Sequence, residues 1–256
     1  MLRFAVAAFL AAVAPATAQG QEAGAPAAAP DSLAQQVGQA YSDIKAGRNN
    51  EALAKIGPLA AAVTARLHEV PGPVYCARSA GEADIYKTQA MPNSSAVKFV
   101  KSQLCDVLFL HAYVLVNLHR TPEAIAQLRS LIALEPAFPH YQVEYGSALR
   151  EVGDLDGALA AYRRAVELAA PVKDYALDQA GGLRGIGFVL TERGDLDGAE
   201  KAYRQSLELA PGHPVAVNEL GYIARLRSGG ARTQAQTVES NSDPAKAALP
   251  KVVQGQ

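Results

Sequence analysis

A six-residue sequence that occurs twice limits the possible folds of this chain more than any other feature. Gly-Asp-Leu-Asp-Gly-Ala stands at residues 153–158 and again at 194–199. An Ala-Tyr-Arg triplet follows each copy at the same spacing, at residues 161–163 and 202–204. Each copy has the pattern of a helix, a Gly-Asp turn, a second helix and a proline stop. The duplication therefore predicts stacked helical hairpins, each of which buries its apolar face on the next.

Small residues, aromatic residues and closing prolines take equivalent places in this unit, and the pattern resembles the tetratricopeptide repeat, whose period is about 34 residues. Gly146 and Gly187, in the two clearest copies, are 41 residues apart. We therefore expect a longer connection or an extended helix near residues 173–179. In an upstream third copy, alanine replaces the glycine and leucine replaces the tyrosine. The three matching sets are Gly146, Leu149, Ala158, Tyr162, Ala165 and Pro171; Gly187, Leu190, Ala199, Tyr203, Ser206 and Pro211; and Ala112, Leu115, Ala124, Leu128, Leu131 and Pro136.

The resemblance implies an all-α fold, a solenoid of antiparallel helix hairpins with flexible N- and C-terminal tails. We place three repeats and a capping helix in residues 104–227, and a degenerate hairpin of the same type in residues 32–69. Residues 228–256 contain no aromatic residue and are rich in polar residues, so we expect a disordered tail.

Residues 70–103 do not fit the repeat, and we interpret them as an irregular connecting segment. Prolines break any helix at both ends, so one helix between residues 74 and 90 is expected to carry Cys76 and Tyr86. Cys76 and Cys105 are the two cysteines of the chain. In an exported chain they can form a disulfide that pins this segment to the array. Two separate buried thiols are the alternative, and neither cysteine has a second cysteine or a close histidine beside it for a metal site.

The first 18 residues have the three parts of a secretory signal peptide. Arg3 gives a positive start, residues 4–13 are apolar, and Ala16-Thr17-Ala18 is a small-residue cleavage site. The apolar run is shorter than the roughly 20 residues that span a membrane. We therefore expect cleavage after Ala18, an Ala/Pro/Gly linker at residues 19–31, and a periplasmic or secreted protein; an uncleaved N-terminal anchor is the alternative.

Motifs of catalysis and of cofactor binding are weak in this sequence. The Gly-rich run at residues 181–187 lacks the Gly-Lys-Ser/Thr ending of a phosphate loop, and we expect its first glycines to loosen the start of a helix. The paired aspartates of the two repeated turns are better explained as helix caps, provided either by Asp154 and Asp195 or by Asp156 and Asp197. The net charge of −1 gives no reason to expect nucleic acid. We therefore predict no enzyme activity, no cofactor, no metal and no membrane insertion of the mature chain. The five histidines, which are scattered, are His68, His111, His119, His140 and His213.

A binding groove follows from the resemblance, because arrays of this family line their concave face with the first helix of each hairpin. Aromatic residues and arginine are the usual hot spots of protein interfaces, and an arginine on each of three successive helices suits an acidic or C-terminal peptide. The Lys/Asn clamp of some family members is absent as a set, and only Asn218 hints at it. The predicted partner-binding residues are Tyr113, Arg150, Arg184, Phe188, Asn218, Tyr222 and Arg225; the wider lining adds Phe109, Val116, Val143, Ser147 and Thr191.

The function predicted from these features is that of a non-catalytic scaffold or adaptor in the bacterial cell envelope, which holds a protein or peptide in the groove. Two alternatives stay open. One is a periplasmic chaperone-like holdase subunit, and the other is a regulatory subunit of a cell-wall enzyme. The sequence predicts neither the partner nor the oligomeric state.

Overall fold

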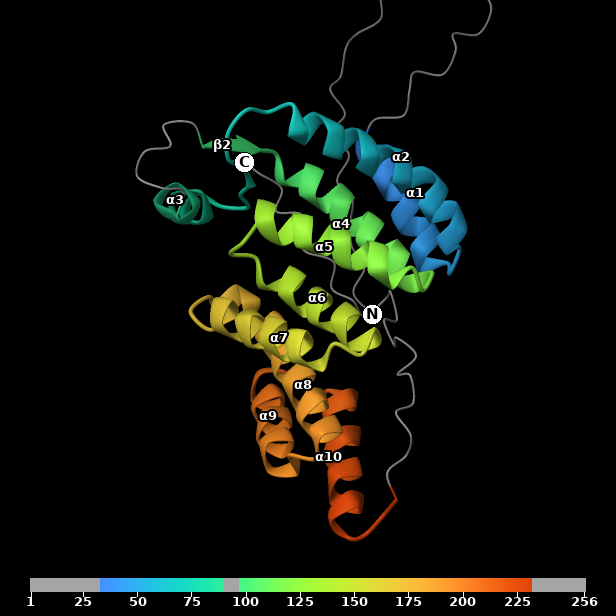
Figure 1. Cartoon of the computed structure of the whole chain (residues 1–256), viewed down its shortest axis with the longest axis vertical. Coiled ribbons are helices and arrows are strands. Elements are labelled where there is room, and N and C mark those ends of the chain that lie inside the picture. Colours follow the sequence, from blue (N-terminus) through green and yellow to red (C-terminus); the bar gives the residue numbers. More distant parts are fainter. Residues whose placement is uncertain (1–32, 90–96, 232–256) are drawn as a thin grey trace, which may run out of the picture. The chain divides into compact units, whose positions relative to one another are not determined.

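The computed structural model of the chain describes residues 33–89 and 97–231, and almost all of the regular structure in these residues is helical (Figure 1). The predicted signal peptide, the linker and residues 232–256 of the predicted tail lie outside the described residues. The elements are α1 (Leu33–Lys45), α2 (Asn49–His68), β1 (Val74–Cys76), α3 (Ala80–Gln89), β2 (Lys98–Val100), α4 (Ser102–Asn117), α5 (Thr121–Leu134), α6 (Pro139–Glu151), α7 (Leu155–Ala169), the 3₁₀ turn η1 (Lys173–Tyr175), α8 (Ala176–Arg193), α9 (Leu196–Leu209) and α10 (Pro214–Arg227).

Consecutive helices pair into hairpins, as the repeats predict. The pairs are α1 with α2, α4 with α5, α6 with α7, and α8 with α9. Each pair packs on the next, through α2 against α4, α5 against α6 and α7 against α8, and α10 follows as a single helix against α9 and α8. The predicted all-α solenoid of helix hairpins is confirmed.

The small residues in the first helices allow the hairpins to close tightly. A Cβ added to Gly146 would lie 2.8 Å from the Tyr162 ring, and one added to Gly187 would lie 2.8 Å from the Tyr203 ring. Real Cβ atoms do not approach a ring that closely, so only glycine fits at either crossing. The period of the small and aromatic residues thus sets the spacing within each hairpin.

The repeated turns are built as the sequence predicts. Gly153 and Gly194 have φ angles of +83° and +82°, the left-handed conformation that ends a helix at little cost only in glycine. The aspartate after each glycine caps the next helix: Asp154 Oδ1 accepts a hydrogen bond from the Gly157 N–H, and Asp195 Oδ1 from the Gly198 N–H, both at 2.9 Å.

The extra residues between the two clearest repeats form η1 and lengthen α8 to 18 residues. The sequence analysis predicted that the first glycines of the Gly-rich run at residues 181–187 loosen the start of α8. This prediction is wrong for two of these glycines. A Cβ on Gly185 would lie 2.4 Å from the Tyr162 ring, and one on Gly182 would lie 2.9 Å from Val166. Both glycines therefore let α8 approach α7 closely, in the same way that Gly146 and Gly187 serve their own hairpins.

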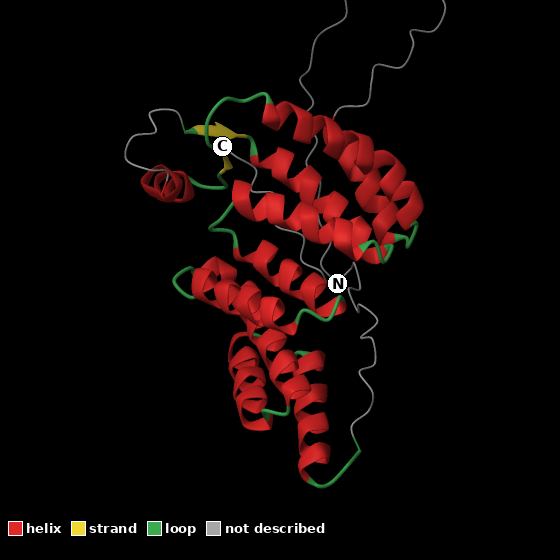
Figure 2. Cartoon of the chain, in the orientation of Figure 1, coloured by secondary structure: helices red, strands yellow, loops and turns green. Residues whose placement is uncertain are grey.

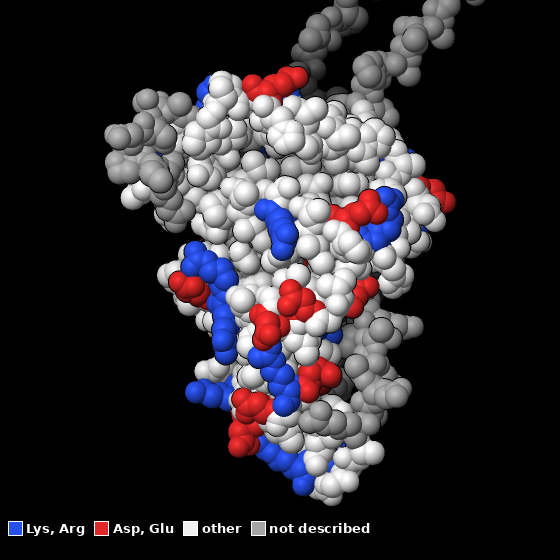
Figure 3. All heavy atoms as spheres, in the orientation of Figure 1, with Lys and Arg blue, Asp and Glu red and all other residues white. Residues whose placement is uncertain are grey.

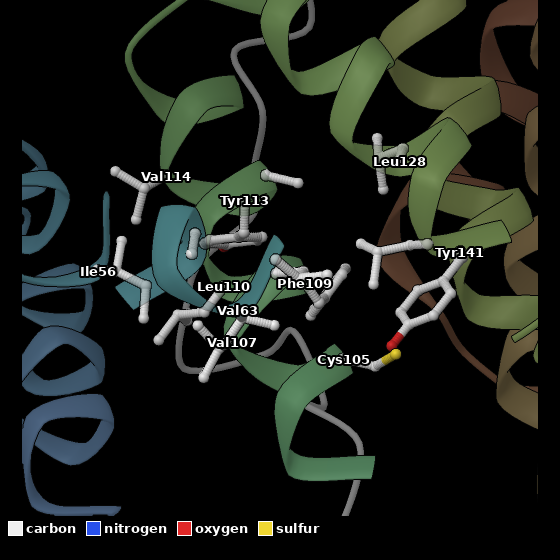
Figure 4. Close-up of a cluster of buried hydrophobic side chains, with 14 of the residues drawn as sticks. Ile56, Val63, Cys105, Val107, Phe109, Leu110, Tyr113, Val114, Leu128 and Tyr141 are labelled. Carbon is white, nitrogen blue, oxygen red and sulfur yellow. The ribbon is translucent and has the colours of Figure 1, made fainter. Parts of the chain in front are cut away.

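The largest buried cluster surrounds α4, which lies between the N-terminal hairpin and the repeats. Figure 4 shows Ile56 of α2 on one side of Val107, Leu110 and other α4 residues, and Val63 of α2 belongs to the same cluster. Leu128 of α5 and Tyr141 of α6 lie on the other side, and all of these side chains are buried. The apolar run of α4 therefore faces neighbours on two sides, which explains why its hydrophobic residues do not alternate with polar ones.

Residues 74–100 contain two short strands that the sequence analysis did not predict. β1 and β2 pair in parallel, with Tyr75 opposite Phe99 (Figure 2). The prediction that a single helix carries Cys76 and Tyr86 is wrong for Cys76, which lies in β1, while α3 begins at Ala80. Ser79 caps α3 by accepting a hydrogen bond from the Glu82 N–H at 3.1 Å, and this cap places the helix start after the strand.

The predicted disulfide between Cys76 and Cys105 is present in the structure. It joins β1 to the first turn of α4, and neither cysteine is exposed to solvent. The irregular segment is thus attached covalently to the array. Across the described ranges no helix is long and apolar enough to cross a membrane.

Candidate functional site

The first helices α6, α8 and α10 carry most of the predicted partner-binding residues, and we call the surface that these residues form the first-helix face. Its centre is a contact between Arg150 of α6 and Phe188 of α8. The Arg150 guanidinium carbon lies 4.0 Å from the centroid of the Phe188 ring. A cation over an aromatic face at this distance is attractive. The pair joins two successive hairpins, and both side chains are only partly buried.

Arg184 of α8 is a partly buried cation without a nearby carboxylate. Its Nη1 donates a 3.4 Å hydrogen bond to Ser206 Oγ of α9. Burial lowers the pKa of Arg184, and no acidic group offsets this effect. Among the described residues no carboxylate oxygen lies within 4.0 Å of its guanidinium. Within residues 33–89 and 97–231, this positive charge therefore has no carboxylate counter-ion.

Gly181 lies one turn before Arg184 on α8, beside Val143 of α6. A Cβ on Gly181 would be 3.4 Å from Val143 of α6 and 3.7 Å from Arg184 Nη2. Val143 and Arg184 thus lie close to the backbone of Gly181 on either side. The first turn of α8 adds Leu177, which is 62% exposed.

The α10 part of the face combines cations, acids and an aromatic ring. The Arg225 guanidinium carbon lies 5.6 Å from the Tyr222 ring centroid, and Asn218 is exposed. Burial, with the like charge of Glu192 second, raises the pKa of Glu219, while Arg150 and Arg225 act in the opposite direction. Arg150 and Arg225 thus have an acidic neighbour, unlike Arg184, so the three arginines of the predicted groove differ in their surroundings.

The α4 residues of the predicted groove are placed differently. Tyr113 is 8% exposed and Phe109 is 3% exposed. The Phe109 ring packs against His140 and Tyr141 of α6, with centroid distances of 5.1 and 5.4 Å. Both α4 aromatics therefore belong mainly to the buried cluster around α4. The structure brings together the predicted residues of α6, α8 and α10, and not Tyr113.

Comparison with known proteins identifies the repeats. The sequence model of the tetratricopeptide repeat (TPR) family matches residues 140–214, which run from the start of α6 to the start of α10. These residues are similar to tetratricopeptide repeats. The described residues have the all-α solenoid fold of TPR proteins. The first-helix face lies on α6, α8 and α10 of this solenoid.

Three solved structures resemble this chain to different extents. A structure described as the MamA RS-1 ArsTM double mutant is 15% identical, with a TM-score of 0.50 over 77% of this chain and 85% of that chain. The first TPR of Spaghetti (RPAP3) bound to an HSP90 peptide is 23% identical, with a TM-score of 0.45 over 50% of this chain and 97% of that chain. YrrB, described as a TPR protein with an unusual peptide-binding site, is 16% identical, with a TM-score of 0.40 over 72% of this chain and 89% of that chain. At these identities the likeness concerns the fold alone. The curated proteins contain no match to this sequence.

A buried charge cluster beside the TPR array was missed by the sequence analysis. Arg78, between β1 and α3, contacts Asp106 of α4, Glu135 at the end of α5 and Tyr141 of α6. Burial raises the pKa of Glu135 to about 7, and Arg78 opposes this shift. Ser79 and Glu82 have the spacing of a helix-capping pair, a signal that would have located the start of α3. No local pattern indicates that Arg78 reaches three other elements.

Charges on the face shown in Figure 3 are mixed in sign. Basic and acidic side chains alternate over α6 to α10, and several form exposed ion pairs, such as Arg193 with Asp156 and Arg227 with Asp197. Exposed pairs of this kind contribute little to stability. Within the described ranges, no three His, Cys, Asp or Glu side chains are grouped as metal ligands.

Proposed function

We propose that this protein is an interaction scaffold whose first-helix face binds an acidic segment of a partner protein. The observation that carries this proposal is Arg184, a desolvated cation with a hydroxyl neighbour and no carboxylate partner among the described residues. A guanidinium that has lost part of its hydration gains most from a carboxylate, because charge-assisted hydrogen bonds are about twice as strong as neutral ones. A partner carboxylate at Arg184 would supply the missing counter-ion.

The neighbours of Arg184 extend the binding site along the face. Val143 and Leu177 offer apolar contacts, and the Arg150–Phe188 stack offers a flat aromatic and cationic platform. Stacked repeats present an extended surface of this kind, which TPR proteins commonly use for binding. The segment that fits best therefore carries a carboxylate between apolar side chains.

Binding can be tested with the full mature chain and labelled peptides of about ten residues. Fluorescence anisotropy would compare an acidic and apolar peptide with one whose acids are replaced by lysine. We expect only the acidic peptide to bind, and Arg184→Met to weaken binding by at least about tenfold, about 1.4 kcal/mol. Arg163→Met, which removes an exposed arginine of α7, is the matched control. Equal binding of both peptides, or undiminished binding by Arg184→Met, would contradict the proposal.

We place this scaffold in the bacterial cell envelope, as a proposal that rests on the signal-peptide pattern of residues 1–18. A disulfide with both sulfurs buried supports it, because such bonds form in oxidising compartments. N-terminal sequencing of the protein from a periplasmic fraction is expected to begin at Gln19. Recovery in the cytosol with Met1 retained would overturn the placement without affecting the peptide test.

A further inference from the structure

Arg78 joins three consecutive helices of the array from outside it. Its Nη2 donates to Asp106 Oδ1 of α4 at 2.8 Å and to Tyr141 Oη of α6 at 3.0 Å. Its Nε lies 2.8 Å from Glu135 Oε1 at the end of α5. The guanidinium also stacks on Phe138 at 4.2 Å. The Arg78 side chain is 11% exposed and that of Glu135 is fully buried, so these contacts are largely shielded from water.

The helix that follows Arg78 extends the same attachment to the next hairpin. Glu82 of α3 accepts hydrogen bonds from the Arg78 backbone N–H at 2.7 Å and from Tyr175 Oη at 2.6 Å. Tyr175 belongs to η1, directly before α8. Tyr86 Oη, one turn further along α3, accepts a 3.3 Å hydrogen bond from the Ala137 N–H in the loop between α5 and α6. Residues 74–86, which we call the brace, thus touch elements from α4 to η1.

The disulfide and Arg78 attach the brace at almost the same place. Cys76 and Arg78 are two residues apart, and their partners Cys105 and Asp106 are adjacent residues near the start of α4. One attachment is covalent and requires oxidation, while the other is ionic and does not. The covalent bond confines Arg78 near its acceptors, which reduces the conformational entropy lost when the ion cluster forms.

We propose that the brace locks the spacing of the α4–α5, α6–α7 and α8–α9 hairpins through two attachments: the disulfide, which requires oxidation, and Arg78, which does not. Either attachment alone keeps the brace docked. When both are lost, Glu135 keeps no cation among the groups that contact it, and the brace separates from the seam between α5 and α6. Loss of the disulfide alone therefore leaves the brace held by Arg78, and loss of Arg78 alone leaves it held by the disulfide.

The lock reaches the first-helix face through the start of α6. Phe138, on which Arg78 stacks, packs edge-on against Tyr141 with a centroid distance of 4.8 Å. His140 contacts Phe109 of α4 and lies 2.8 Å from Asp178 of α8. Release of the brace would therefore loosen the N-terminal ends of α6 and α8, while α9 and α10, whose residues form none of these bonds, would keep their packing.

Hydrogen exchange with mass spectrometry tests the lock without any partner. The full chain would be compared as wild type, Arg78→Met, Cys76→Ala/Cys105→Ala, and the triple variant. In peptides covering residues 136–142 and 173–178 we expect small increases for the first two variants. For the triple variant we expect exchange at least about tenfold faster than the product of those two effects predicts. This factor corresponds to about 1.4 kcal/mol of coupling between the disulfide and Arg78. Peptides from α9 and α10 are the internal control.

Two results would overturn the proposal. One is that the exchange rate of the triple variant in these peptides equals the product of the effects of the two separate changes. The other is faster exchange spread evenly over the chain, α9 and α10 included, because a local lock cannot cause it. If the triple variant does not fold, Arg78→Lys combined with Cys76→Ala/Cys105→Ala replaces it. Lysine keeps the positive charge but cannot make the forked contacts of arginine. The exchange rates of this variant are then compared in the same way with those of its two component changes.

Discussion

Single glycines set how closely the helices of this protein approach one another. Gly187 and Gly221 occupy equivalent places in successive first helices, but their surroundings differ. A Cβ on Gly187 would lie 2.8 Å from the Tyr203 ring, whereas the nearest atom to a Cβ on Gly221 is Arg225 Nη1 at 3.9 Å. The reason is that α8 is covered by its second helix, α9, while no second helix follows α10 in the part of the chain that the structure describes.

Alanine at these two glycines is expected to change stability in opposite directions. Gly187→Ala forces the Tyr203 ring to move and should lower the free energy of unfolding by about 1–3 kcal/mol. Gly221→Ala gains helix propensity without a clash and should raise it by up to about 1 kcal/mol. Urea denaturation followed by circular dichroism measures both. Equal signs for the two variants would show that the crossing is not as tight as this geometry implies.

At the scale of the element, the second helices depend on the capping aspartates. Asp154 and Asp195 each bond the backbone N–H three residues later, whereas Asp156 and Asp197, in the first turn of the same helices, form exposed ion pairs with arginines. The four aspartates thus look equivalent in sequence, yet two satisfy a helix terminus and two are solvated.

Removal of a cap should therefore cost more than removal of an exposed aspartate. Asp154→Ala is expected to lower the free energy of unfolding by about 1 kcal/mol, the usual value of an N-cap. Asp156→Ala, its matched control two residues away, should change it by less than about 0.5 kcal/mol. Thermal or urea unfolding of the two variants provides the comparison, and a larger loss for Asp156→Ala would reverse these roles.

At the scale of the whole molecule, the brace and its ion cluster bond to three successive hairpins, whereas the repeat pattern predicts contacts only between one hairpin and the next. Repeat arrays are held together by contacts between neighbours. Here Arg78 and Glu82 add bonds that reach from α4 to η1. These bonds require the carboxylate of Glu135 to be fully buried, and removal of a carboxylate from water is unfavourable. Stability should consequently depend on the protonation of this one residue.

The free energy of unfolding is expected to decrease with rising pH because of Glu135. Burial raises the pKa of Glu135 to about 7, above its ordinary value of 4.5. The folded chain therefore holds this proton more tightly than the unfolded chain, and the free energy of unfolding should fall as pH rises from about 4.5 to about 7. The fall is at most about 3 kcal/mol, at about 1.4 kcal/mol per pKa unit. The Glu135→Gln variant should not show this fall when its free energy of unfolding is measured by urea denaturation at several pH values. If the variant and the wild type depend on pH in the same way, Glu135 is not the cause.

The sequence alone determined the features that depend on local pattern. The repeated turns, the glycine and tyrosine crossings, the helix-ending glycines and the capping aspartates can be predicted because each needs a particular residue at a fixed spacing, within one hairpin. The disulfide could be anticipated because only two cysteines are present. Arg150, Phe188 and Tyr222 could be assigned to one face because helical periodicity and the repeat place them on successive first helices.

Only the tertiary structure decided the features that depend on distant neighbours. Tyr113 is mostly buried because α2, α5 and α6 surround α4, and the repeat pattern that placed Tyr113 in the groove does not show these neighbours. Gly185 packs against Tyr162 from the preceding hairpin, and Arg78 meets partners 28 to 63 residues away. β1 forms because β2 lies beside it. Burial and ion pairing across such separations arise from packing between elements, a physical property that the local sequence pattern does not contain.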